Sequence, residues 1–429
     1  MNIQPGHDHK RGKTRKSQLA WAFYDWANSS FAVVVIAGFF PVLFKQYWGK
    51  PLENTESTFW LGAANSGASL LIVVLAPLAG ALADRLGRRK GFLLITALFG
   101  ILMTGCLGLA AQGAWLLAAL LYMLAQVGFM GANVFYDALL ITVSGESGQE
   151  RDRVSITGFG LGYLGGGLMF AFCVLMTQQP QWFQIADATA AAKISFLLVA
   201  LWWAVFSLPL LFYVFEEQVP SEPFADALRA SVGRVLQTLR ELKQLRMAVI
   251  FLAAYWLYID GVGTVIRMAV DYGMSIGFDQ GNLIVALLIT QLIGFPATFA
   301  YGRLARRVGV RGGIFVGIGV YALITVWGSL MQSVWEFYAL AVVIGLVQGG
   351  VQALSRSLFS RLIPQHQVAE LYGFYNMVGK SAAVIGPVMI GWLGVLTGSP
   401  RLAILSLLLL FAGGFLLLLM VKLPAESQE

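Results

Sequence analysis

The sequence predicts an all-α membrane protein whose helices cross the bilayer twelve times, in two bundles of six related by a pseudo-two-fold axis. Three observations predict this fold class: the composition, twelve long apolar segments, and an uneven distribution of lysine and arginine. Of the 429 residues, 58% are hydrophobic and 12% are charged, whereas soluble domains average about 45–50% apolar and about 25% charged residues. This composition excludes an ordinary soluble enzyme, a disordered chain and a nucleic-acid-binding protein.

Twelve segments are long and apolar enough to cross a membrane, since a spanning helix needs about 20 such residues. The alternation expected of a membrane β-barrel is missing, so these segments should be helices. The predicted spans are 20–44, 59–83, 92–112, 114–136, 154–177, 194–215, 248–271, 282–302, 313–332, 335–355, 372–397 and 402–421.

Lysine and arginine predict the orientation of these spans. With the N-terminus in the cytoplasm, 23 of the 29 Lys and Arg residues lie on the cytoplasmic side. The four on the opposite side are Lys45, Lys50, Lys193 and Arg401. Because cytoplasmic loops are enriched in these residues, we expect an inner-membrane protein with both termini in the cytoplasm. The net charge of +7 is then mostly a signal of topology.

The chain divides into five parts. They are a cytoplasmic tail (1–18), a first six-helix bundle (19–215), a cytoplasmic linker (216–247), a second six-helix bundle (248–421) and a second tail (422–429). The linker is predicted to contain an amphipathic helix lying along the membrane surface, because leucines and valines alternate there with arginines. The first apolar segment is too long for a cleaved signal and is expected to stay in the protein.

The two halves contain a repeated motif. The segments Gly80–Lys90 and Gly302–Arg311, which end the second and eighth predicted spans, share the frame G-x-L-A-x-R-x-G-x-R. Tandem six-helix repeats are an architecture of secondary transporters.

Polar residues gather in predicted spans one, four, seven, ten and eleven, while spans three, six, nine and twelve have no charge in their cores. Charges in a membrane span are costly and usually face a bundle interior or water. The four uncharged spans should therefore lie at the periphery, and the polar ones should share a hydrated cavity. The candidate substrate-binding or coupling residues are Asp25, Asn28, Asn133, Asp137, Asp260, Arg267, Gln352, Arg356, Asn376 and Lys380.

Some of these residues have structural alternatives. Asp25, Asp137 and Arg356 lie within about two turns of the cytoplasmic ends, so they could be helix caps or interfacial charges instead. Arg267 and Asp271 are four residues apart and could form a salt bridge along one helix.

An enzyme is not favoured. All three histidines lie outside the spans, the motif H-E-x-x-H is missing, and Cys106 and Cys173 have no metal-ligand spacing. We therefore expect no catalytic residue, no metal site and no cofactor. A channel is disfavoured because no repeated re-entrant segment is visible.

The segment Gly80–Lys90 resembles the loop signature of the major facilitator superfamily, G-x-x-x-D-R-x-G-R-R-[KR]. The resemblance implies that spans one, four, seven and ten line the cavity, and that Asp84 faces the N-terminus of span eleven and holds the cytoplasmic side shut. In the second copy Arg306 replaces the aspartate, which implies a weaker gate. The gate-motif residues are Gly80, Asp84, Arg85, Gly87, Arg88, Arg89, Gly302, Arg306, Arg307 and Gly309.

A narrower resemblance is to the Atg22-like, vacuole effluxer-type branch, also called the UMF1 family in bacteria. It rests on four segments: Tyr24–Ser29, Tyr258–Gly261, Gln348–Arg356 and the run from Tyr375 to Pro387. This branch implies export of amino acids, as in its fungal vacuolar members.

We therefore expect a secondary active transporter that moves a small polar solute, an amino acid or a small organic acid, by alternating access. Export coupled to protons is the expected mode, in a monomer within the lipid bilayer. Lys380 and Arg356 would contact a carboxylate, and Asp260 or Asp25 would contact an ammonium group or carry the proton. A polyspecific drug exporter of the same fold is the alternative, with a membrane-embedded enzyme as a remote third.

Overall fold

The computed structural model describes residues 14–144, 148–216, 226–231, 233, 237, 245–363, 374–375, 378–379, 382 and 385–422. In this part of the chain all regular elements are helical. Ten helices are long and apolar enough to cross a membrane, and two shorter apolar helices, Gln280–Gly294 and Ile385–Thr397, accompany them. The prediction of an all-α membrane protein is confirmed.

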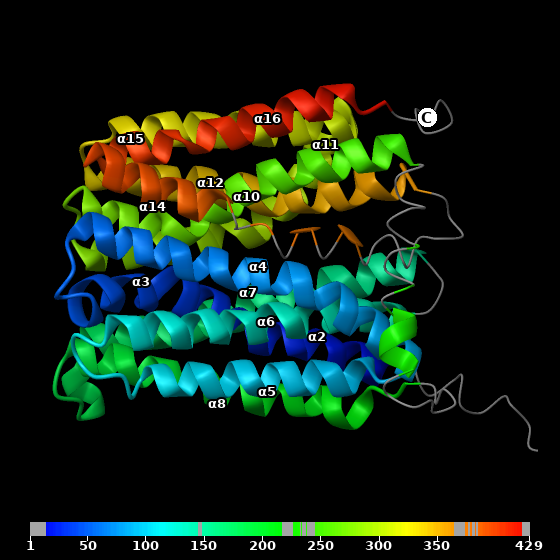
Figure 1. Cartoon of the computed structure of the whole chain (residues 1–429), viewed down its shortest axis with the longest axis horizontal. Coiled ribbons are helices and arrows are strands. Elements are labelled where there is room, and N and C mark those ends of the chain that lie inside the picture. Colours follow the sequence, from blue (N-terminus) through cyan, green and yellow to red (C-terminus); the bar gives the residue numbers. More distant parts are fainter. Residues whose placement is uncertain are drawn as a thin grey trace, which may run out of the picture.

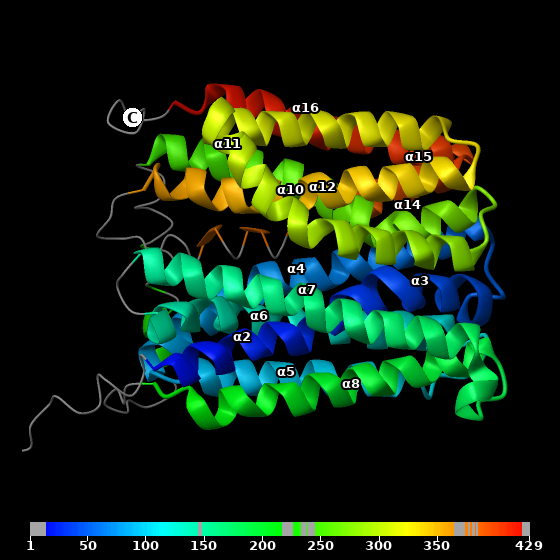
Figure 2. The ribbon, with the colours of Figure 1, turned by 180° about the vertical axis from the view of Figure 1, so that it is seen from behind.

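The helices form two groups that follow the order of the chain (Figures 1 and 2). The N-terminal half contains α2 (Arg15–Ser30), α3 (Phe40–Leu43), α4 (Asn54–Leu86), α5 (Arg89–Leu107), α6 (Trp115–Ser144), α7 (Gly148–Gln178) and α8 (Ala188–Tyr213). The C-terminal half contains α10 (Arg246–Ser275), α11 (Gln280–Leu330), α12 (Val334–Ser360), α14 (Ile385–Thr397), α15 (Pro400–Leu405) and α16 (Leu407–Met420). Helices α4 and α7 of the first half lie against α14 and α11 of the second.

The start of α2 and the end of α16 lie at one end of the molecule, called the terminal end below (Figure 1). The opposite, distal end carries the loops that follow the first span and α10. The two halves contact each other closely near this distal end, where a Cβ on Gly62 of α4 would collide with the backbone of Pro387 in α14.

The first span is longer than predicted. It runs from Arg15 to Trp48, because two π-helical segments, η1 (Phe31–Phe39) and η2 (Phe44–Trp48), continue α2 and α3. The buried Trp48 ring packs on Phe40, at 5.5 Å between ring centroids. This aromatic packing favours continuation of the helix and places Lys45 inside it, where a loop was predicted.

Both copies of the repeated motif have a glycine with positive φ at the corresponding position. Gly87 has φ 60° and Gly309 has φ 77°, in the left-handed region that glycine adopts without steric cost. Gly87 turns the chain from α4 into α5, and Gly309 divides α11 between the predicted eighth and ninth spans. In both copies the glycine with positive φ therefore lies where one predicted span gives way to the next.

The peripheral position of the uncharged spans is confirmed. Helices α5, α8 and α16 expose large apolar side chains along one side, such as Leu98, Leu201 and Leu409. The predicted amphipathic helix of the linker lies largely outside the described residues, as do Asn376 and Lys380.

Candidate functional site

A hydrogen-bonded pair joins two helices predicted to line the cavity. Asn28 of α2 donates through its side chain to Oδ1 of Asn133 in α6 at 2.8 Å, and both residues are buried. Next to Asn28, Ser29 Oγ donates to Oδ1 of Asp25, one turn earlier, over a longer distance of 3.4 Å. The polar face predicted for the first span therefore points into the protein.

Around this pair, near the terminal end, lies a cavity of about 40 Å³ that both halves line. The N-terminal half contributes most of the lining residues, and the C-terminal half contributes Arg356 of α12. Its lining residues are Trp21, Asp25, Asn133, Tyr136, Asp137, Phe159 and Arg356. A space of this size holds a few water molecules, so an amino acid could enter only if the halves moved apart.

Ring stacking and a hydrogen bond hold the aromatic side of the cavity in place. The rings of Trp21 and Tyr136 stack with centroids 4.2 Å apart and planes 9° apart. The Trp21 indole N–H also donates to the Tyr136 carbonyl at 2.8 Å. This arrangement holds α2 and α6 together directly beside Asp25 and Asp137.

Glycines of α7 allow close approach to the same face of α2. A Cβ on Gly162 would lie 3.1 Å from the carboxyl carbon of Asp25, and one on Gly165 would lie 2.5 Å from the Trp26 carbonyl oxygen. The glycine-rich fifth span thus packs against the helix that carries the candidate carboxylate, as small residues do between membrane helices.

Asp260 has a different environment from the one predicted. Its Oδ2 accepts from the backbone N–H of Ile385 at 2.9 Å, and its Oδ1 accepts from Gly386 N–H at 3.2 Å and from Thr264 Oγ1 at 3.2 Å. The carboxylate therefore caps the first turn of α14, where a negative charge is stabilised by the helix dipole. It is not among the residues that line the cavity around Asp25.

A further contact connects two polar helices of the C-terminal half. The hydroxyl groups of Tyr258 in α10 and Ser355 in α12 lie 2.6 Å apart. Gln352 lies one turn before Arg356 in α12 and is half-buried. The tenth span thus contacts the seventh through Tyr258, whereas Asp260 of the seventh span contacts α14.

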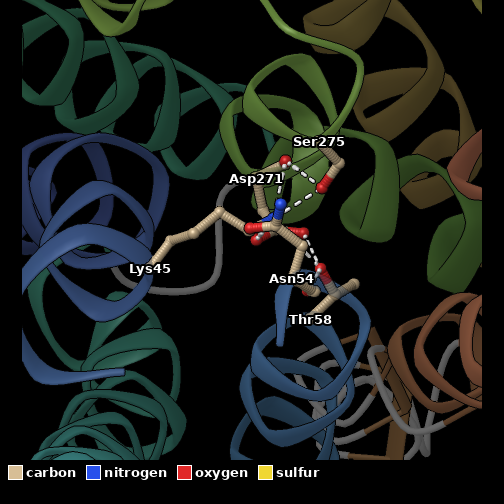
Figure 3. Close-up of polar contacts among 5 residues, drawn as sticks. All are labelled: Lys45, Asn54, Thr58, Asp271 and Ser275. Carbon is tan, nitrogen blue, oxygen red and sulfur yellow. Dashed lines mark hydrogen bonds and ion pairs between the residues drawn. The ribbon is translucent and has the colours of Figure 1, made fainter. Parts of the chain in front are cut away.

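The salt bridge considered as an alternative for Arg267 and Asp271 is not formed. Asp271 pairs with Lys45 of the N-terminal half, with 2.8 Å between Nζ and Oδ1 (Figure 3). Arg267 instead donates to the Ala382 carbonyl at 3.4 Å. Proximity in sequence suggested the local partner, but a cation on another helix occupies the carboxylate.

This distal cluster, defined as Lys45, Thr58, Asp271 and Ser275, was missed by sequence reasoning. Thr58 of α4 donates to Asp271 Oδ2 at 2.7 Å, and Lys45 Nζ lies 2.5 Å from Ser275 Oγ (Figure 3). The signal that could have found it is the run Phe44-Lys-Gln-Tyr47-Trp48, in which aromatic residues lie on both sides of the lysine.

The structure describes some of the residues of the gate motif. Arg85 lies in the last turn of α4, and Arg88 and Arg89 begin α5. Arg307 lies in α11 two residues before Gly309. The side chains of Asp84 and Arg306 lie outside the described part, so the predicted contact of Asp84 with span eleven remains a prediction.

Glu216 contacts the motif from the end of the sixth span. Its Oε2 accepts from the backbone N–H of Lys90 at 2.8 Å. Burial raises the pKa of the Glu216 carboxyl above its ordinary value of 4.5, and hydrogen bonds from the Lys90 and Arg89 backbone partly offset this rise.

Among the described residues, no group of three or more His, Cys, Asp or Glu side chains could hold a metal ion.

Comparisons with known proteins show the family of this chain. Residues 53–429 match the family model described as "Vacuole effluxer Atg22 like". The chain is 35% identical over 416 residues to the uncharacterized MFS-type transporter YxiO of Bacillus subtilis, covering 96% of each chain. It is 27% identical over 303 residues to autophagy-related protein 22-1 of Aspergillus niger, covering 65% of this chain and 48% of the relative.

Among solved structures, the nucleoside transporter NupG has a TM-score of 0.66 at 13% identity, over 94% of this chain and 98% of that one. This likeness shows the fold. The similarity to YxiO over nearly the whole chain shows that this protein is of the MFS transporter type. Within that class, the chain belongs to the Atg22-like vacuole effluxer family.

Proposed function

We propose that this protein is a secondary active transporter that exports an amino acid or a small organic acid by alternating access. Twelve spans in two six-helix bundles would rock about the cavity. The cavity lined by Asp25, Asp137 and Arg356 is the observation that carries the proposal, because it brings both signs of charge to the contact between the halves.

The charges of the cavity favour a solute that itself carries charge. A guanidinium binds carboxylates through charge-assisted hydrogen bonds, and the two carboxylates can receive an ammonium group. Arg356 is therefore assigned the solute carboxylate, and Asp25 and Asp137 are assigned the ammonium group or the coupling proton. The resemblance to vacuole effluxers supports amino acids as the substrate class and export as the direction.

Asp25 is better placed than Asp260 to carry a proton. Both oxygens of Asp260 accept hydrogen bonds from backbone N–H groups of α14, so a proton on either oxygen would meet a fixed donor. Asp25 lines the cavity, where a proton can reach it together with the solute.

The structure is closed at the distal end. We assign this end to the outside and the terminal end to the cytoplasm, in the inner membrane, because 23 of 29 Lys and Arg residues then face the cytoplasm. The solute would enter the cavity from the cytoplasmic side. A monomer in the bilayer is sufficient for this mechanism, because one chain supplies both halves.

The test is transport by the purified protein in liposomes. A panel of labelled amino acids and small organic acids is added outside vesicles that are acidic inside, so that outward proton movement drives solute uptake by antiport. The proposal predicts uptake of at least one such solute, abolished when the pH gradient is collapsed. Transport of structurally unrelated hydrophobic drugs, with none of the panel moved, would support the polyspecific exporter instead.

A further inference from the structure

The distal cluster joins the two halves through charge. Lys45 comes from the first span and Thr58 from α4, both in the N-terminal half, while Asp271 and Ser275 come from α10 in the C-terminal half (Figure 3). The side chains of Lys45 and Asp271 are 6% and 2% exposed. All the polar contacts of this carboxylate to the N-terminal half would break if the halves separated here.

Separation would leave Asp271 on α10 without Lys45. A buried carboxylate that loses its cation is strongly destabilised. Along α10, Arg267 lies four residues before Asp271, which places the two on the same face of the helix, one turn apart. Arg267 is therefore the nearest cation on the same helix that moves together with Asp271.

In the closed form, no carboxylate among the described residues forms an ion pair with Arg267, although the charge of Asp260 attracts it. Within the described residues its hydrogen bond is the one to the Ala382 carbonyl at 3.4 Å, and the neighbouring carboxylate of Asp260 is bound to the backbone of α14. A guanidinium carries five donors and is rarely buried without an anion. The half-buried Arg267 therefore has donors that an additional carboxylate can use.

We propose that Asp271 exchanges cations during transport. Lys45 holds it when the distal end is closed, and Arg267 takes it when that end opens. The distal cluster is then the outer gate, and Arg267 stabilises the open form. This exchange rests on the proposed alternating-access function.

The test reads the opening of the gate directly and needs no substrate. Ile390 of α14 is 4% exposed and lines the small cavity beside Thr58 and Asp271. In an Ile390→Cys protein, the rate of labelling by a membrane-impermeant maleimide reports how often the distal end opens. The protein without this substitution supplies the background labelling of Cys106 and Cys173. Below, the parent is the Ile390→Cys protein. Intact cells and inverted vesicles are compared, so that a reversed orientation is recognised separately.

Lys45→Met should raise the labelling rate by at least about fivefold, because it removes the cation of the closed form. Arg267→Gln should lower the rate by a similar factor, because it removes the cation of the open form, and Arg267→Lys should restore it. Arg401→Gln is the matched control and should label like the parent. Arg401 lies at the same end and donates to the Ser329 carbonyl at 2.9 Å, apart from the cluster.

The charge-swapped protein Lys45→Asp/Asp271→Lys separates cation exchange from a simple salt bridge. Its pair can still close the gate, but the lysine at position 271 would face Arg267 in the open form. It should therefore label more slowly than the parent. Labelling at the parent rate in this protein, or in Arg267→Gln, would overturn the exchange. An unchanged rate in Lys45→Met would overturn the gate itself. If Arg267→Gln does not fold, the charge swap and Arg267→Lys carry the test.

Discussion

Asn28 of α2 donates a hydrogen bond to Asn133 of α6 at 2.8 Å, with both side chains buried inside the N-terminal half. This bond fixes the relative rotation of two helices whose next polar residues, Asp25 and Asp137, line the cavity. The position of the candidate carboxylates is thus set by a neighbouring amide pair.

A double-mutant cycle on this pair should reveal coupling. Asn28→Ala and Asn133→Ala should each lower the stability measured by thermal unfolding in detergent, because each leaves a buried amide without its partner. The coupling energy should be about 0.6 kcal/mol and at most ~1.7 kcal/mol, as for other hydrogen bonds between membrane helices. Ser195→Ala, which removes a bond within one helix, serves as the control; additive effects at Asn28 and Asn133 would contradict the coupling.

Substitution of Asp260 should affect stability and transport together. Asp260→Asn places an NH₂ group against a backbone N–H of α14, so we expect a loss of about 1–3 kcal/mol of stability and impaired transport. Thr264→Val removes only the side-chain bond to Asp260 and should have a smaller effect. Full gradient-driven transport by Asp260→Asn would exclude this residue both as proton carrier and as an essential cap.

Two glycines of α7 provide a matched pair for packing. Gly165→Ala should destabilise the protein by about 1–3 kcal/mol through overpacking, because the new Cβ would lie 2.5 Å from the Trp26 carbonyl oxygen. Gly167→Ala meets nothing within 4 Å and should be neutral. Equal thermal stability of the two variants would show that α7 does not pack on α2 as described.

Glu216 should make stability depend on pH. Because burial raises the pKa of its carboxyl above 4.5, the protonated form is favoured in the folded protein. Its contribution to stability is therefore fully present below pH 4.5 and is lost as pH rises through the raised pKa. Glu216→Gln should remove this part of the dependence. Identical pH profiles of melting temperature for parent and variant would contradict the assignment.

Much of the architecture could be predicted from the sequence because a bilayer restricts where charge can go. Because a charge in hydrocarbon is costly, Asp25, Asp137 and Arg356 were expected to face a protein interior. In the structure these three residues line one cavity. The repeat with Gly87 and Gly309 was visible as a motif, and both glycines have positive φ.

What could not be predicted depends on contacts between distant segments. The partner of Asp271 lies 226 positions away in the chain, and nothing in a single sequence favours it over Arg267, which is one turn away. Lys45 was placed in a loop because hydropathy falls at that residue, although aromatic packing continues the helix to Trp48. The role of Asp260 as a cap depends on where α14 begins, which periodicity does not determine.

The central claim is that a charged solute binds between the halves at Asp25 and Arg356, and solute counterflow in proteoliposomes tests it most directly. Counterflow exchanges labelled for unlabelled solute and requires no ion gradient, so it reports binding and rocking without proton coupling. The solute is the one identified in the liposome panel. The matched controls are Asp187→Asn, an exposed cap of α8, and Arg361→Gln, at the exposed end of α12.

Arg356→Gln should reduce counterflow by about tenfold or more, because it removes a charged hydrogen-bond donor from the solute carboxylate. Asp25→Asn should reduce it if Asp25 binds the ammonium group, and should abolish only gradient-driven uptake if Asp25 carries the proton. Both controls should exchange like the parent protein. Counterflow and gradient-driven uptake at parent rates in both Arg356→Gln and Asp25→Asn would contradict the account.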